Sequence, residues 1–456
     1  MRTIKFKKVN NNYYSVDRKD SVLVAPVLMY QKAFWVKGPF RKEKRVSEIP
    51  FMFPGDANNK YILSGNMNRV LSYLIEKKIP CEFEEEICDF EETKVELETL
   101  LPREDQIRLI RKGLEEKQGV IISPTGSGKT IITMGVISAM KYYNILLLAH
   151  TIDIVKQTSK KIVKEIPFFK DKIQVLGGGD SAFSKDYRLT VSTIQTFEKQ
   201  NLKELEDWFD VIIIDEAHHV NSVNSEYGKL LLQLDAPMKI GFTATKPSER
   251  EKELSCEGLL GPILGELTNK EAIEKGIIAK PYIKLYKVPY DHKISASFGK
   301  YAEIYNSGIV NNEIRNNLIV SVTKEFMAKK ESVLILVTRV EHGEILSRMI
   351  GCPFVWGSST EKVRDEIKDS LQNKDNLCVV SSVIWKEGVD MPSLDVVINA
   401  AGGKSEIQTI QFIGRGFRVT ETKKSFTVVD FFDNSHRFFV EHFGNRLTTY
   451  FNMGWM

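Results

Sequence analysis

Short apolar runs, each followed by a small or polar residue and then by a helical pattern, recur along most of this chain. After Leu101 such runs occupy residues 119–124, 144–150, 172–177, 189–197, 210–220 and 239–245. A second series follows Lys280, at residues 331–338, 352–357, 377–383, 396–402 and 426–432. Strands that alternate with helices form parallel sheets through right-handed crossovers. The pattern therefore predicts two tandem α/β domains, each with a parallel sheet buried on both faces.

The N-terminal part of the chain has a different pattern. Residues 21–27, 32–38 and 61–65 are predicted as short strands, and residues 66–78 as an amphipathic helix. We predict a small α+β domain at 1–95, followed by α/β domains at 96–275 and 280–456.

Charge is distributed unevenly over the N-terminal part. Residues 1–80 carry 16 Lys/Arg against 6 Asp/Glu, whereas residues 81–100 carry one basic residue against nine acidic ones. An excess of cations attracts a polyphosphate backbone, because binding releases condensed counterions. The alternative is a solvated basic surface that binds nothing.

Composition excludes several classes of protein. The chain has 456 residues, of which 42% are hydrophobic and 27% are charged, as in proteins that bury a substantial core. No apolar run reaches the roughly 18 residues of a membrane span, and the basic N-terminus lacks the apolar block of a signal peptide. The five cysteines show no metal-ligand spacing. We expect a cytoplasmic protein without membrane contact.

The segment Ser123–Thr130, SPTGSGKT, stands between an apolar run and a helical pattern. This context is typical of a phosphate-binding loop, in which glycines let backbone N–H groups approach the phosphates at a helix N-terminus. Lys129 is predicted to reach the β- and γ-phosphates of ATP, and the Thr130 hydroxyl to reach Mg²⁺. Ser123 stands where the pattern GxxxxGK(S/T) has glycine. The predicted cradle consists of Pro124, Thr125, Gly126, Ser127, Gly128, Lys129 and Thr130.

Two adjacent carboxylates follow the apolar run 211–214. Asp215 is placed to reach Mg²⁺, and Glu216 to orient and deprotonate the attacking water. His219, which follows the sequence DEAH, is expected to pack or to cap a helix. Together with the loop, this pair predicts ATP hydrolysis with Mg²⁺ as the metal.

The order of these and further motifs resembles the superfamily-2 helicases over roughly residues 100–435. Residues 101–106, LPREDQ, look like the adenine-recognising segment, which implies that Arg103 and Gln106 bind the nucleotide. Residues 243–245, TAT, match the motif that links nucleotide state to domain closure.

Two motifs of the second domain complete the resemblance to that superfamily. Residues 411–418 are similar to the motif QxxGRxxR, which implies that Arg415 and Arg418 act on the γ-phosphate. Residues 381–392 look like a further conserved motif of that superfamily, motif V. This resemblance implies that Gly388 and Asp390 lie at the nucleotide cleft.

The resemblance also implies contacts with DNA by small polar residues at strand ends, each of which could instead cap a helix. A loop at 177–190 is a second candidate, as a hairpin in which Phe183 or Tyr187 separates the strands. The alternative is that these aromatic rings pack a surface loop. The implied DNA contacts are Thr151, Thr193, Gln195, Thr338 and Ser382.

Residues 246–283 and 428–451 resemble the restriction-enzyme-like (ResIII) branch of DNA translocases, and the compact layout resembles phage branched-DNA helicases of the UvsW kind. The resemblance implies two RecA-like domains that unwind or branch-migrate forked and junction DNA in replication, recombination or repair. A double-strand translocase that does not unwind, such as a restriction-type motor subunit, is one alternative. A non-hydrolysing junction-binding protein is another. The sequence DEAH disfavours an RNA helicase.

Overall fold

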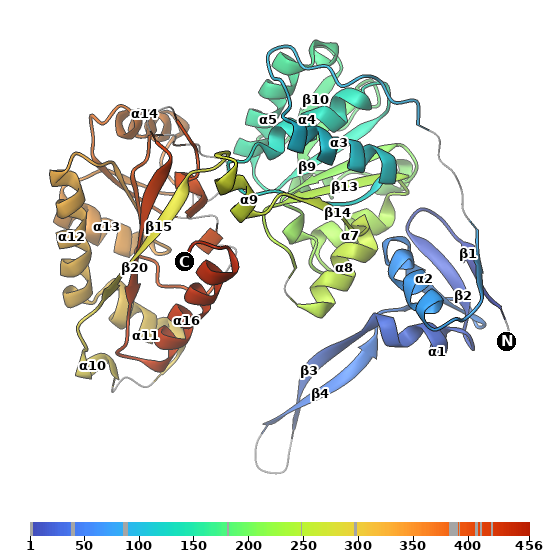
Figure 1. Cartoon of the computed structure of the whole chain (residues 1–456), viewed down its shortest axis with the longest axis horizontal. Coiled ribbons are helices and arrows are strands. Elements are labelled where there is room, and N and C mark those ends of the chain that lie inside the picture. The colour runs from blue at the N-terminus through green and yellow to red at the C-terminus, as the bar shows by residue number, and fades with distance from the viewer. Residues whose placement is uncertain are drawn as a thin grey trace. The chain divides into compact units, whose positions relative to one another are not determined.

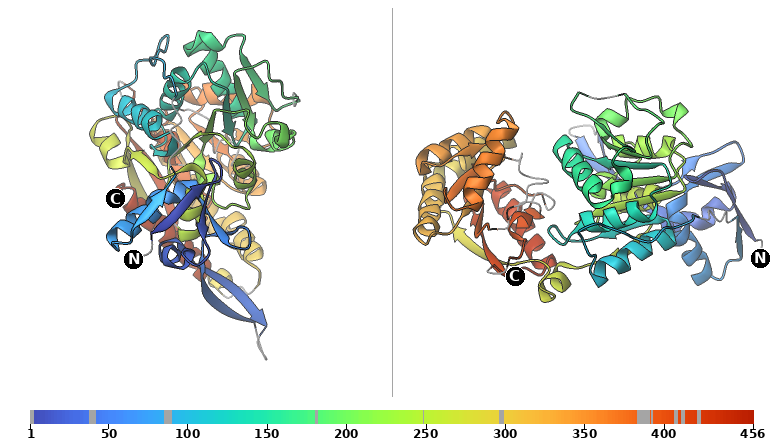
Figure 2. Two further views of the ribbon diagram at one scale, coloured as in Figure 1. Left: turned by 90° about the vertical axis from the view of Figure 1, so that its right-hand side faces the viewer. Right: turned by 90° about the horizontal axis from the view of Figure 1, so that it is seen from above.

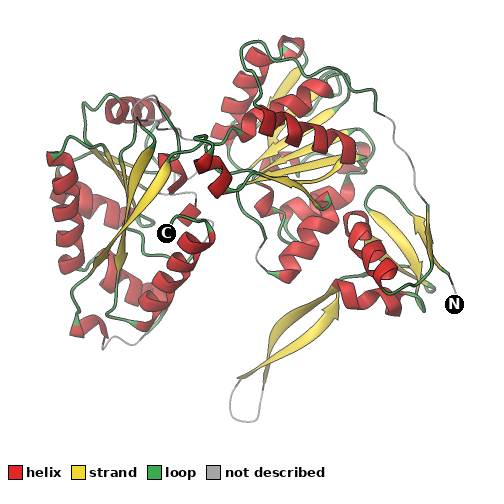
Figure 3. Cartoon of the chain, in the orientation of Figure 1, coloured by secondary structure: helices red, strands yellow, loops and turns green. Residues whose placement is uncertain are grey.

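The computed structural model describes residues 3–37, 42–84, 90–179, 182–247, 249–295, 299–382, 391, 393–405, 409–410, 413–420 and 423–456. They divide into two compact units, Met1–Ser123 with Gly128–Leu267, and Pro124–Ser127 with Thr268–Met456. Each unit contains one large parallel sheet with helices packed on its faces (Figure 1, Figure 3). The predicted fold class, two parallel α/β domains with a small α+β N-terminal part, is confirmed. No described helix has the length and apolar character that a membrane span requires.

The large sheet of the first unit has seven parallel strands in the order β10-β11-β9-β12-β13-β8-β14. Because the pairing is parallel and in register, the carboxyl ends of the strands meet at one edge: Thr193 pairs with Ala149, Asp215 with Phe242. The strands are β8 (Gln118–Ile122), β9 (Ile145–Ala149), β10 (Ile173–Leu176), β11 (Leu189–Thr193), β12 (Val211–Asp215), β13 (Met238–Thr243) and β14 (Ile263–Glu266).

Helices cover both faces of this sheet, as right-handed crossovers require. On one face lie α3 (Glu104–Glu116), α4 (Lys129–Ala139) and α5 (Ile152–Glu165). On the other lie α6 (Ile194–Phe197), α7 (Glu226–Gln233) and α8 (Arg250–Leu260). Residues on both faces of β9 and β12 are buried, which explains why these strands read as unbroken apolar runs.

The N-terminal part forms a second sheet in the order β5-β6-β2-β1-β7. The predicted strand at 21–27 is wrong: these residues form α1 (Ser21–Val24) and a 3₁₀ turn, because Val24 and Leu28 both pack inward at helical spacing. The predicted helix at 66–78 is confirmed as α2 (Met67–Glu76). The strands are β1 (Ile4–Lys8), β2 (Tyr13–Asp17), β5 (Phe53–Pro54), β6 (Asn59–Leu63) and β7 (Cys81–Phe83).

Two nine-residue strands leave this sheet as a long hairpin. The strand β3 (Met29–Lys37) pairs antiparallel with β4 (Lys42–Pro50) in a two-stranded sheet of its own. The hairpin extends away from the N-terminal sheet (Figure 1, Figure 2). Residues 29–50 contain six Lys/Arg and two Asp/Glu, so the hairpin is strongly basic.

The N-terminal part packs tightly on α8 of the same unit. Apolar side chains from both form one continuous core, in which Leu63 and Val70 join Leu254 and Leu259. Arg69 on α2 forms ion pairs with Glu253 and Glu257, the first at 2.6 Å. This interface combines apolar burial with paired charges, so the N-terminal part and the large sheet form a single body.

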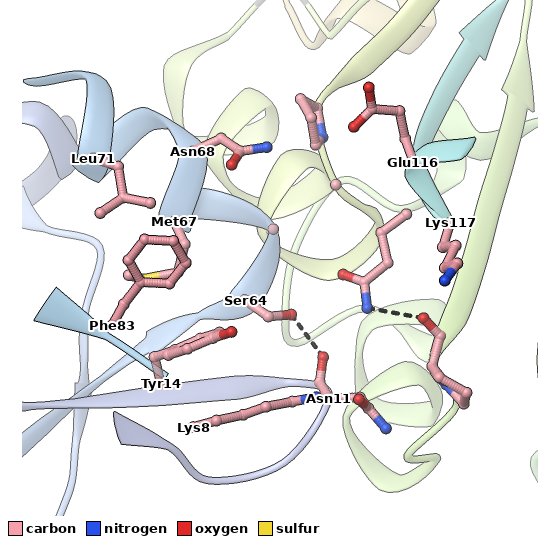
Figure 4. Close-up of a pocket in the computed structure, with 15 residues that line it drawn as sticks. Lys8, Asn11, Tyr14, Ser64, Met67, Asn68, Leu71, Phe83, Glu116 and Lys117 are labelled. Carbon is pink, nitrogen blue, oxygen red and sulfur yellow. Dashed lines mark hydrogen bonds between the residues drawn. The ribbon is translucent and has the colours of Figure 1, made fainter. Parts of the chain in front are cut away.

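A cavity of about 330 Å³ marks the junction of the N-terminal sheet with the large sheet (Figure 4). Lys8 and Tyr14 line it from β1 and β2, and Gln118 and Pro237 line it from the amino ends of β8 and β13. The Gln118 amide donates to the Pro237 carbonyl at 3.3 Å. This contact lies at the amino edge of the sheet.

The second unit has a six-stranded parallel sheet in the order β15-β20-β19-β16-β18-β17. Its strands are β15 (Lys280–Lys287), β16 (Val333–Leu336), β17 (Phe354–Val355), β18 (Cys378–Ser381), β19 (Val396–Asn399) and β20 (Ser425–Phe432). Its helices include α9 (Asn269–Glu274), α10 (His292–Ser295), α11 (Tyr301–Tyr305), α12 (Glu313–Ala328), α13 (Val340–Ile350), α14 (Glu361–Gln372) and α16 (Arg437–Asn452).

Two buried ion pairs anchor long helices to the end of β20. Arg315 on α12 donates to Asp433 at 2.8 Å, and Arg446 on α16 donates to Asp430 at 2.7 Å. Arg315 also donates to the Ala400 carbonyl at 2.9 Å. The sequence motifs do not reveal these arginines, because each finds its partner only through the fold.

Lys239 provides a pH-dependent test of the junction. Its side chain is buried, donates to the Asn12 side-chain oxygen, and has a pKa lowered to about 8, mainly by burial. Between about pH 8 and the ordinary lysine pKa, the unfolded chain binds more protons than the folded chain, so stability rises with pH. We expect the free energy of unfolding of the wild type to rise by about 2 kcal/mol between about pH 7.5 and about pH 9.5, and Lys239→Met to abolish this rise. Urea unfolding of the wild type and the variant at several pH values measures this free energy. A difference in stability between the two proteins that does not change with pH would contradict a lowered pKa for a buried Lys239.

Candidate nucleotide site

The predicted phosphate loop connects the end of β8 to the start of α4. The Ser123 N–H donates to the Thr243 carbonyl at 3.0 Å, which extends the pairing of β8 with β13 by one residue. Gly126 and Gly128 adopt left-handed backbone angles, with φ of +81° and +95°, which glycine adopts without strain. The Ser127 hydroxyl donates to the Pro124 carbonyl at 2.6 Å and closes the turn. The chain thus reaches the N-terminus of α4 through a tight, glycine-dependent loop.

Lys129 and Glu216 face each other at the carboxyl edge of the sheet. The Lys129 ammonium lies 3.6 Å from the Glu216 carboxylate, and both side chains are largely buried. The second carboxylate oxygen of Glu216 lies 3.2 Å from Nδ1 of His218. Burial alone would raise the pKa of Glu216, but Lys129 and His218 outweigh it and lower the pKa to about 2. Glu216 is therefore ionised at neutral pH.

Asp215 and Thr130 line the same small cavity beside the loop. Asp215 is the last residue of β12, and one of its carboxylate oxygens accepts the Glu216 N–H at 3.0 Å. Thr130 belongs to the first turn of α4. Carboxylate and hydroxyl oxygens are ligands that Mg²⁺ accepts, so these two residues fit the predicted metal.

Gln106 anchors the predicted adenine segment to the loop. Its side chain is fully buried, and its Nε2 donates to the Gly128 carbonyl at 3.5 Å. Its Oε1 accepts the Arg103 N–H at 2.9 Å, at the start of α3. The Arg103 guanidinium donates to Asp105 at 3.0 Å. Both predicted residues therefore lie beside the loop.

The predicted closure motif contacts the carboxylate of Glu216 through one histidine. Nδ1 of His218 lies 3.2 Å from the Thr243 hydroxyl as well as 3.2 Å from Glu216. The Thr243 hydroxyl in turn accepts the Thr245 N–H at 3.2 Å. A carboxylate accepts but does not donate, so Nδ1 carries the proton and donates to it. β12 and β13 are thereby connected through side chains at their carboxyl ends.

His219 packs, as the sequence predicted. Its ring stacks on His150 with centroids 4.2 Å apart and an interplanar angle of 13°, and its ring centroid lies 4.3 Å from that of His218. Sequence motifs did not assign a role to His150. The pairing of β9 with β12 brings the two loops together.

The five residues predicted to contact DNA lie at strand ends or helix starts. Thr151 accepts the Ile154 N–H at 3.4 Å as the N-cap of α5, and Thr193 donates to the Thr196 hydroxyl at 2.9 Å. Gln195 lies 3.5 Å from Glu226. In the second unit, the Thr338 hydroxyl lies 2.7 Å from the Tyr305 hydroxyl, and the Ser382 N–H donates to the Val355 carbonyl at 2.9 Å.

The second-unit residues predicted to act on ATP are described only in part. Gly388 and Asp390 lie outside the described residues. Arg415 lies in a 3₁₀ helix, Gly414–Gly416. Arg418 is exposed and forms an antiparallel bridge with Ile278.

Of the two interpretations of the loop at 177–190, the described residues favour the packed surface loop, because no strand lies between Gly177 and Arg188 in the described part of this segment. Phe183 packs edge-on against Phe197 and Phe209, with centroids 6.2 and 5.8 Å away. Tyr187 is exposed. Phe183 is partly buried and packs against the core, which agrees with the alternative that its ring packs a surface loop.

These features define a phosphate-loop nucleoside triphosphatase with two parallel α/β units. Residues 99–248 match the family described as type III restriction enzyme, res subunit, and residues 315–420 match the helicase conserved C-terminal domain. The chain thus belongs to the superfamily-2 helicases of the ResIII branch.

Several known proteins are similar to this chain. A protein called helicase 22, from a Sulfolobus islandicus filamentous virus, is 28% identical over 76% of this chain and 66% of its own length. The DNA 3'-5' translocase XPB2 of Sulfurisphaera tokodaii is 25% identical over 76% of this chain and 85% of its own. The ATP-dependent DNA helicase uvsW of phage T4 is 24% identical over 71% of this chain and 67% of its own. The chain thus spans about two thirds of the viral and phage relatives.

One solved structure shows the same fold. It is a fragment assigned to the HsdR subunit of a type I restriction enzyme from Vibrio vulnificus YJ016, with a TM-score of 0.58 and 14% identity. The match covers 88% of this chain and 87% of that one.

Gly128→Ala tests the loop geometry. A Cβ at this position would lie 2.5 Å from Nε2 of Gln106, on a backbone with φ of +95°. We expect affinity for an ATP analogue to fall at least about ten-fold, because left-handed strain costs about 1–2 kcal/mol before the clash is counted. Gly444→Ala, in α16 with open space around it, is the control. Fluorescence titration with a labelled ATP analogue measures the affinity of both variants. An unchanged affinity in Gly128→Ala would show that this loop does not cradle phosphate.

Proposed function

We propose that this protein is an ATP-dependent DNA helicase or translocase that acts on forked and junction DNA. The observation that carries the proposal is the pairing of Lys129 with Glu216 at the edge of the sheet. It occurs in a chain whose relatives are named DNA helicases and translocases. Such a protein would work in the cytoplasm of a bacterium or a phage-infected host, and we propose that it does so as a monomer.

Lys129 has two alternative anionic partners in this proposal. Without nucleotide it neutralises Glu216, and with nucleotide it moves to the β- and γ-phosphates, where its charge is needed. Glu216 then loses the cation that lowers its pKa, which increases its ability to accept a proton from the attacking water. Thr130 and Asp215 would hold Mg²⁺, which when bound neutralises charge on the phosphates.

The second unit supplies the remaining charges in our proposal. Arg415 and Arg418 act on the γ-phosphate, where an arginine contributes about 10³–10⁵ in rate. Gly388 and Asp390 complete the nucleotide cleft. Since groups from both units would surround one triphosphate, hydrolysis would alternate with opening and drive movement along DNA.

DNA phosphates are the proposed ligands of the small polar residues at the strand ends. Phosphate contacts position a motor without reading sequence, as translocation requires. The basic hairpin β3–β4 is suited to the arm of a fork, because it extends from the N-terminal sheet and carries excess positive charge. The proposed phosphate contacts are Thr151, Thr193, Gln195, Thr338 and Ser382.

The decisive experiment measures ATP hydrolysis and strand separation on matched single-strand, duplex, forked and four-way-junction DNAs. We expect hydrolysis to be stimulated most by forked and junction DNA, with unwinding from a 3' tail, as the name of XPB2 suggests. Glu216→Gln should bind nucleotide but hydrolyse it about 10²–10⁴-fold more slowly. Glu115→Gln on the exposed face of α3 is the matched control.

Each alternative function has its own outcome in that experiment. Hydrolysis stimulated by duplex without strand separation would indicate a translocase. Junction binding and strand separation that survive in Lys129→Ala would indicate a non-hydrolysing binder. Hydrolysis that no DNA stimulates would contradict the proposal.

A charge reversal tests the hairpin. Deleting residues 1–95 would expose the core shared with α8, so we prefer Lys32→Glu with Arg45→Glu, both exposed. We expect fork affinity to fall and the salt slope to decrease by about two, since each phosphate contact contributes about one unit. Lys362→Glu with Lys368→Glu on α14 changes net charge equally and serves as the control. Fluorescence anisotropy at several salt concentrations measures the fork affinity of both double variants. An equal loss of fork affinity in the two variants would reject the hairpin as a DNA contact.

A further inference from the structure

The carboxyl edge of the first sheet holds three histidine rings in contact. His150 follows β9, and His218 and His219 lie in the turn that follows β12, the neighbouring strand. The rings of His150 and His219 stack with centroids 4.2 Å apart, and the rings of His219 and His218 lie 4.3 Å apart. The ring of Tyr227 also stacks with that of His219, with centroids 6.1 Å apart and an interplanar angle of 13°.

One end of this stack adjoins the proposed DNA contact. Thr151 follows His150 directly and caps α5, so a displacement of this turn by a bound phosphate moves the His150 ring with it. Nδ1 of His150 is buried and has no hydrogen-bond partner among the described residues. Among the described residues, the ring of His150 stacks on that of His219.

The other end of the stack contacts the catalytic carboxylate. His218 holds Glu216 at 3.2 Å and Thr243 at 3.2 Å through the same ring nitrogen. Its Nε2 is buried without a hydrogen-bond partner among the described residues, and its ring contacts that of His219. A shift of the His219 ring therefore changes how His218 supports Glu216.

We propose that His150 and His219 are positioning residues that couple DNA binding at the turn after β9 to the orientation of Glu216. The two rings are half-buried and in direct contact, so one ring cannot move toward the other without displacing it. This inference rests on the proposed DNA-stimulated hydrolysis and names the side chains that carry the stimulation. Neither ring touches the reacting atoms, and both act through His218.

The test compares basal and DNA-stimulated hydrolysis in the full chain. We expect His150→Ala and His219→Ala to retain the basal rate and the KM for ATP. DNA stimulation should fall about ten-fold, within the range of ordinary coupling effects. The double variant should lose no more than either single variant, because the two rings form one contact. His150→Phe and His219→Phe keep a flat ring and should restore the stimulation.

A matched control removes a histidine ring contact elsewhere. His292→Ala deletes an exposed ring that packs on Tyr290 at 5.0 Å in the second unit, and should leave stimulation unchanged. If DNA stimulates hydrolysis by the wild type and stimulates the alanine variants to the same extent, the inference is overturned. So would equal loss of basal and stimulated rates, or phenylalanine variants that behave like alanine. A wild type that no DNA stimulates would refute the proposed function itself and the coupling with it.

Discussion

The structure of the nucleotide site depends on parallel pairing in register. In a parallel sheet every crossover returns the chain to the same end, so the carboxyl ends of all strands of the large sheet in the first unit lie at one edge. Residues separated by more than a hundred positions, such as Ser123 and Thr243, thereby become neighbours. The phosphate loop, the paired carboxylates and the histidines lie close together because each of them lies at or just after the end of a strand at this edge.

Charge at that edge is stabilised by mutual neutralisation. A carboxylate as buried as Glu216 would favour protonation on its own, because burial penalises the charged form. The nearby ammonium of Lys129 and the N–H of His218 reverse this preference. In the mechanism we propose, a nucleotide phosphate competes for the same ammonium, so the ionic environment of Glu216 would change when nucleotide binds. Ligand binding would thereby be linked to the basicity of one side chain.

Glycine and buried polar contacts position the N-terminal part. Gly65 lies against the backbone of Glu257 so closely that any Cβ would overlap its carbonyl oxygen. Asn11, Asn12 and Asn66 donate to backbone or side-chain oxygens of the large domain, including Asp235 at 2.7 Å. These contacts lie at the amino edge and on α8. The hairpin therefore extends from a firmly held base.

The sequence by itself determined the parallel α/β architecture, the phosphate loop and the carboxylate pair, because each depends on local pattern: apolar runs, glycines and adjacent acids. Local pattern failed at 21–27, where packing of Val24 and Leu28 imposed a helix. It left two alternatives open for Phe183, and the packing of this ring against Phe197 favours the surface loop. Only the tertiary structure decided which distant side chains meet: Lys239 with Asn12, Arg315 with Asp433, His150 with His219. The physical reason is that such pairs join residues on different strands and helices, and their partners are chosen by sheet order and burial rather than by spacing along the chain.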